Sequence, residues 1–131
     1  MKHGWFSWVP AAAWAAVLFL VSSRQTLGVD LDGGLDKLAH FGAYLVLGAL
    51  LAFGANRQGI RPLAAVGLGM LYGVLDELHQ SLVPGRSPEL GDWLADALGT
   101  LAGVALFLLV RRLRGGLGNE IAAASAESTS I

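Results

Sequence analysis

The chain has 131 residues, of which 54% are hydrophobic and 15% are charged, and its mean hydropathy is +0.57. This composition excludes an ordinary soluble domain and indicates an all-α integral membrane protein. The net charge of -1 argues against a nucleic-acid partner, and the lack of cysteine excludes a disulfide, a thiolate nucleophile and a zinc–thiolate site.

Apolar runs divide the chain into spans. An α-helix needs about 20 residues to cross a bilayer, and four runs approach this length: residues 5–22, 38–55, 62–79 and 93–110. We therefore predict four transmembrane helices within a membrane domain of residues 1–114. Residues 115–131 turn to Gly, Ala, Ser and Thr, and we expect this tail to be disordered.

The first run has a second interpretation. Lys2 precedes an apolar stretch that ends in the small residues Ser22 and Ser23, which is also typical of a signal peptide. The run contains three tryptophans, which favour a retained helix because Trp anchors spans at the membrane interface. Residues 1–23 are therefore either a retained helix or a signal peptide.

Basic residues set the orientation, because cytoplasmic loops carry an excess of Lys and Arg. Six basic residues fall on one side of the predicted spans: Lys2, Arg57, Arg61, Arg111, Arg112 and Arg114. Three fall on the other: Arg24, Lys37 and Arg86. This distribution predicts that both termini are cytoplasmic and that the acidic residues of the spans face outside.

Polar residues follow helical spacing on three spans, so each set shares one helix face. The second span carries Asp36, His40 and Tyr44. The third carries Gly69, Gly73, Asp76 and Gln80, with Glu77 beside them, and the fourth carries Asp92, Asp96, Gly99 and Gly103. If the third and fourth spans are antiparallel neighbours, glycines face glycines and carboxylates face carboxylates. These faces predict a polar funnel in the outer third of the bilayer.

The adjacent acids Asp76 and Glu77 close an apolar run, where an ionised group costs about 2.5–3.5 kcal/mol at a helix centre. Either some of these acids carry a proton and act as general acids or bases, or cations compensate them. Arg86 is the best-placed cation, on a Pro84–Gly85 turn that precedes a helix with Ser87 as N-cap. Arg86 is either a structural ion-pair partner or a ligand-binding group.

A divalent metal is a further way to compensate the acids. His40, Asp76, Glu77 and Asp96 offer imidazole and carboxylate ligands that suit several metals. No spaced motif of the kind that identifies metal sites is present, however. We therefore expect no cofactor.

Four motifs over roughly residues 30–105 carry a family resemblance. They are Asp36-Lys37-x-x-His40-Phe41-x-x-Tyr44, Asp76-Glu77-x-x-Gln80, Pro84-Gly85-Arg86-Ser87 and Asp92-x-x-x-Asp96-x-x-Gly99. Together they resemble the VanZ-like family of small bacterial membrane proteins, named for a protein associated with teicoplanin resistance. Where that family often has Asn in the last motif, this chain has Asp96, which adds a negative charge.

The resemblance implies a multi-pass protein of the bacterial cytoplasmic membrane with a role in the cell envelope and in teicoplanin tolerance. The outward-facing funnel leads us to hypothesise an amphiphilic partner, either membrane lipid, a lipid-linked envelope precursor or a lipoglycopeptide. We assign the candidate roles by chemistry: proton transfer to His40, Asp76 and Glu77; substrate binding to Lys37, Arg86, Tyr44 and Gln80; orientation to Asp36, Asp92, Asp96, Gly85 and Gly99.

Several classes of protein remain open. An envelope enzyme would depend on the proton-transfer groups, whereas a binding protein would depend on Arg86 and Lys37. A small proton-coupled transporter or a structural membrane subunit would need to work as a homodimer. Either Gly99 with Gly103 or Gly69 with Gly73 offers a small-residue face for it, but only by leaving the packing inside the bundle.

Overall fold

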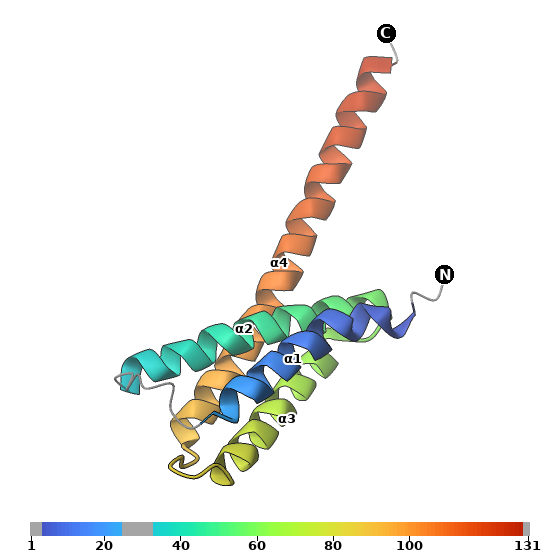
Figure 1. The fold of residues 1–131 in the computed structure, drawn as a ribbon. Coiled ribbons are helices and arrows are strands. Elements are labelled where there is room, and N and C mark those ends of the chain that lie inside the picture. The colour runs from blue at the N-terminus through green and yellow to red at the C-terminus, as the bar shows by residue number, and fades with distance from the viewer. Residues whose placement is uncertain (1–3, 25–32, 130–131) are drawn as a thin grey trace.

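The computed structural model describes residues 4–24 and 33–129, and the described residues form helices without any strand. The elements in order are the 3-10 helix η1 (Trp5–Trp8), α1 (Val9–Ser22), α2 (Gly33–Arg57), α3 (Pro62–Ser81) and α4 (Leu90–Thr129). Consecutive helices alternate in direction, and the end of α4 projects away from the other three (Figure 1). The all-α prediction is confirmed. Lys2 and residues 30–32 of the motif region lie outside the described residues.

Three helical segments are long and apolar enough to cross a membrane: Trp5–Ser22, Gly34–Arg57 and Leu90–Ser128. The 20-residue helix α3 is not among the spans found in the described part of the chain. Its last turns carry Asp76, Glu77 and Gln80, which lower its mean hydropathy. Three of the four predicted spans are therefore supported by length and composition.

The bundle has an apolar end and a polar end. Near the α2–α3 turn, the small residues Ala52, Ala55 and Ala65 pack with Val104 in a buried cluster. Toward the opposite end, most buried side chains are polar or charged: Ser22, Asp76, Glu77, Gln80, Asp92 and Asp96. Burying so many polar groups requires partners inside the protein. The polar end is therefore where a functional site is expected.

The glycines of α4 pack differently from the sequence prediction. A Cβ atom added at Gly99 or Gly103 would collide with the backbone carbonyl of Phe41 or Leu45, both on α2. The α3 residue Gly69 lies against the Thr100 side chain, not against a glycine. The predicted glycine-to-glycine contact of α3 and α4 is therefore wrong, because α4 packs most extensively against α2.

The ends of α4 also differ from the predictions. The helix begins at Leu90, after the predicted N-cap Ser87, and the Glu89 carbonyl accepts the first N–H groups, from Asp92 at 3.1 Å and Trp93 at 3.3 Å. Its C-terminal end runs to Thr129, where the sequence predicts a disordered tail from residue 115. Residues 109–128 are all exposed. The alanines at 122–124 and 126 favour a helix at its far end, whereas Gly115, Gly116 and Gly118 disfavour it, so composition alone does not explain why the helix continues.

Candidate functional site

The predicted stripe on α2 lines a cleft at the polar end of the bundle. The cleft has a volume of about 670 Å³ and is bordered by α1, α2, α3, the first turn of α4 and the segment that joins α3 to α4. Asp36, His40 and Tyr44 all line it, as the spacing of four residues predicts. Its wall also includes apolar side chains of α1 and α2, among them Leu18 and Val21.

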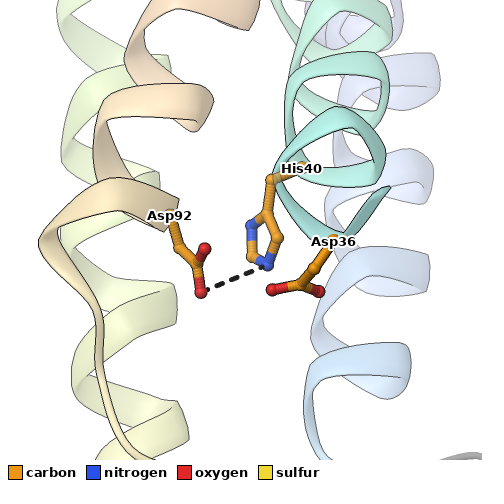
Figure 2. A group of neighbouring side chains, drawn as sticks. All are labelled: Asp36, His40 and Asp92. Carbon is orange, nitrogen blue, oxygen red and sulfur yellow. Dashed lines mark ion pairs between the residues drawn. The ribbon is translucent and has the colours of Figure 1, made fainter. Parts of the chain in front are cut away.

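His40 connects α2 to α4 through both ring nitrogens. Its Nδ1 lies 2.8 Å from Oδ1 of Asp96, and its Nε2 lies 3.9 Å from Oδ2 of Asp92. Figure 2 shows the imidazole ring between Asp92 on α4 and Asp36 on the same helix as His40. Asp96 has no exposed surface. A buried carboxylate on one ring nitrogen fixes the orientation of the imidazole.

Lys37 is held by two acids at the start of α4. Its Nζ atom lies 3.0 Å from Oε2 of Glu89 and 3.0 Å from Oδ1 of Asp92. Asp92 is buried while Glu89 is exposed, so Lys37 supplies the positive charge that the buried carboxylate needs. The ammonium group is therefore engaged within the protein and does not line the cleft.

A second chain of hydrogen bonds runs along α3. The Tyr44 hydroxyl donates to Oδ2 of Asp76 at 3.3 Å, and this pair is buried. One turn further on, Gln80 donates to Oγ of Ser22 at 3.0 Å and accepts from Nη2 of Arg86 at 3.2 Å. These contacts tie α1, α2 and α3 to the loop that carries Arg86.

The loop presents Arg86 through a tight turn. The Arg86 N–H donates to the Val83 carbonyl at 3.1 Å, with Pro84 and Gly85 at the central positions. Gly85 has φ of 82°, the conformation that the third residue of a type II turn requires and that favours glycine. The predicted Pro84–Gly85 turn is confirmed, and it directs Arg86 toward the cleft.

Glu77 lies behind the cleft, facing a smaller hollow of about 340 Å³ on the other side of α3. Its Oε2 atom accepts the Glu89 backbone N–H at 3.0 Å. Its Oε1 atom is buried and, within the described residues, has no hydrogen-bond partner; the same is true of Oδ2 of Asp96. Each of these two carboxylates therefore has one positioned oxygen and one unpartnered oxygen.

Among the described residues, two groups of side chains could hold a metal ion. Asp36, His40 and Asp92 bring ligand atoms within 4.8 Å of one another, and so do His40, Glu77 and Asp96. The sequence prediction had placed Asp76 with His40, Glu77 and Asp96. In the structure Asp76 belongs to neither group. Its Oδ2 atom instead accepts a hydrogen bond from the Tyr44 hydroxyl.

Sequence reasoning missed several residues of this site. Ser22 and Arg24, at the end of the first span, line the cleft, although no motif marked that span. Glu89 contacts both Lys37 and Glu77. Thr100 is fully buried beside Gly69. Only Thr100 carried a usable signal, since it lies four residues after Asp96 and so shares its helix face.

A bundle of long apolar helices around a buried ionisable site defines a multi-pass membrane protein. A protein-family comparison identifies which kind. The VanZ/LLP1 family model matches residues 2–111, so the chain belongs to the VanZ/LLP1 family, as its motifs predicted. Neither a curated protein nor a solved structure gives a match.

Proposed function

We propose that the chain crosses the bacterial cytoplasmic membrane four times, with both termini in the cytoplasm and the cleft facing outside. The distribution of Lys and Arg supports this orientation. The surface of α3 supports it as the fourth span. Its exposed large side chains form an apolar stripe, which suits contact with lipid while the acids face inward: Leu68, Leu71, Leu75 and Leu78.

The cleft binds the polar head of an amphiphilic envelope component. The observation that carries this proposal is the composition of its wall, which combines aliphatic residues such as Leu18 and Val21 with His40, Asp76 and Arg86. A lipid-linked precursor or a lipoglycopeptide has the matching chemistry, with a polar head for the charged residues and an acyl chain for the aliphatic ones.

Arg86 is the main contact to an anionic group of that partner. It lines the cleft, and its hydrogen bond to Gln80 occupies one of five guanidinium donors. The remaining donors suit a phosphate or carboxylate. Lys37 is less suited to this role, because two carboxylates already hold its ammonium group.

An enzymatic function on the same partner is the second candidate. The His40–Asp96 pair supports it, since a histidine on a cleft wall that is oriented by a buried carboxylate has the geometry of a general base. The homodimeric transporter has less support. The glycine face it would need, at Gly99 and Gly103, packs against α2 inside the bundle.

Antibiotic susceptibility tests the envelope role. Wild-type protein expressed in a sensitive Gram-positive host is expected to raise tolerance to teicoplanin several-fold and to leave vancomycin tolerance unchanged, because only the first drug carries an acyl tail. Arg86→Gln should lose this tolerance. Removing a charge-assisted hydrogen bond of about 1.5–3 kcal/mol weakens binding by about tenfold or more.

The matched control is Arg111→Gln, which removes the same charge from an exposed position near the middle of α4, outside the cleft. It should retain full tolerance at equal membrane levels of protein. If wild type has no effect on either drug, the proposed tolerance function does not apply to this chain. If Arg111→Gln fails as well as Arg86→Gln, the effect of Arg86 is one of overall charge and not of binding in the cleft.

A further inference from the structure

We propose that His40, Glu77 and Asp96 form a binding site for one divalent transition-metal ion in the wall behind the cleft. The three residues come from α2, α3 and α4, and their ligand atoms lie within 4.8 Å of one another. One imidazole and two carboxylates form a donor set that suits Zn²⁺, Mn²⁺ or Fe²⁺. This inference stands independently of the partner proposed for the cleft.

Two carboxylate oxygens without hydrogen-bond partners favour this group over the other candidate group. Oε1 of Glu77 and Oδ2 of Asp96 are buried, and no hydrogen bond reaches either atom in the described part of the chain. The two side chains are 8% and 0% exposed. A buried carboxylate oxygen without a partner is strongly unfavourable unless a proton or a cation compensates it. A divalent ion between these residues satisfies both atoms and balances both negative charges.

The remaining oxygen of each carboxylate is already positioned. The Glu89 backbone N–H holds Oε2 of Glu77 at 3.0 Å, and Nδ1 of His40 lies 2.8 Å from Oδ1 of Asp96. The first contact orients Glu77 and can remain when the ion binds. The second brings His40 and Asp96 together but is broken on binding, because Nδ1 faces Asp96 and becomes the ligand atom. The ion takes the place of the proton between His40 and Asp96, so binding releases a proton.

The neighbouring group of Asp36, His40 and Asp92 is the weaker candidate (Figure 2). Lys37 already neutralises its buried acid, Asp92, at 3.0 Å. An ion there would have to compete with the ammonium group for the same carboxylate. The structure therefore assigns the ion to the side of His40 that faces Glu77 and Asp96.

Two of the three proposed ligands each line a hollow of the protein. His40 lines the cleft of about 670 Å³, and Glu77 lines the hollow of about 340 Å³ on the other side of α3. The three ligands lie between the two. An ion at this position would join three helices and contribute to the stability of the bundle.

Metal titration of the purified full-length protein tests the site. After treatment with a chelator, the protein in detergent is titrated with Co²⁺, whose visible absorption reports the ligand field, and then with Zn²⁺ in competition. Wild type is expected to bind one equivalent of either ion, with release of protons in weak buffer. Glu77→Gln and Asp96→Asn should weaken binding by at least about tenfold.

Asp36→Asn is the matched control, because it makes the same change of carboxylate to amide beside the other edge of His40. It should bind Co²⁺ within a few-fold of wild type. Circular dichroism shows whether each variant is folded. Should a variant unfold, the wild-type thermal midpoint is followed with and without Zn²⁺, and it should rise with the ion.

Two results would overturn the proposal. One is a wild-type protein that neither binds Co²⁺ or Zn²⁺ at millimolar concentration nor gains thermal stability from them. In that case protons alone would compensate Glu77 and Asp96. The other is binding that depends on Asp36 as strongly as on Glu77, which would place the ion on the opposite side of His40.

Discussion

Tyr44 is fully enclosed between α2 and α3, and its hydroxyl is the donor to Asp76. The carboxylate is buried and depends on donors from the protein, because water has little access to it. Tyr44 therefore has a defined structural role, whether or not it also contacts a ligand in the cleft. The hydrogen bond from Tyr44 also explains how Asp76 can be buried near the end of α3, a mostly apolar helix.

We expect Tyr44→Phe to lower the free energy of unfolding by about 1–3 kcal/mol, the cost of leaving a buried acceptor without its donor. Thermal or denaturant unfolding of the purified protein in detergent measures the change. In an Asp76→Asn background the same substitution should cost less, because the amide is uncharged. Equal costs in both backgrounds would show that the hydrogen bond is not the source of the effect.

The contact of α2 with α4 depends on residues without side chains. Gly99 and Gly103 on α4 lie directly against the backbone of α2, and Gly48 on α2 lies against the backbone of Thr100. Such close approach brings the two helices near enough for extensive van der Waals contact. It also sets the distance between His40 on one helix and Asp96 on the other.

Gly103→Ala is expected to destabilise the protein by about 1–3 kcal/mol, because the new methyl group meets the Leu45 carbonyl. The matched control is Gly42→Ala in α2, where an added Cβ has nothing within 4 Å. That change should be neutral, or stabilising by up to about 1 kcal/mol through helix propensity. Unfolding experiments on both variants check the pair, and similar values for the two would contradict the observed packing.

Helical spacing correctly predicted which residues share a helix face, but it did not predict which helix each face contacts. The period of 3.6 residues correctly grouped Asp36 with His40 and Tyr44, because spacing along one helix is a local property. Which helix each face meets depends on how the helices cross, and a single sequence does not contain that information. The glycines of α4 were therefore assigned to α3, although they pack on α2.

The whole molecule concentrates its ionisable residues at one end of the bundle. The residues that line the cleft at that end come from all four helices and from the connections between them. Sequence pattern and charge distribution identified this end and most of its acids. They missed Ser22 and Arg24, since the first span has no pattern that distinguishes residues facing the cleft from residues facing lipid.

Cysteine labelling tests the proposed orientation, because the chain has no cysteine of its own. A membrane-impermeant maleimide should label Ser87→Cys, at the cleft end, in intact cells. Ala122→Cys, on the exposed end of α4, should react only after the membrane is permeabilised. The reverse pattern would place the cleft in the cytoplasm, and labelling of both in intact cells would place the cleft and the end of α4 on the same outer side.

The length of α4 has a mechanical consequence. Its 40 residues extend about 60 Å, twice the thickness of the hydrocarbon core, so one continuous helix joins Asp92 and Asp96 to the far end. By the same rise per residue, a tilt of about 10° at the cleft displaces the tip by about 10 Å. Fluorescence energy transfer between a dye at residue 122 and the bilayer surface would measure this displacement of the tip. A constant distance on ligand binding would show that the cleft works without tilting α4.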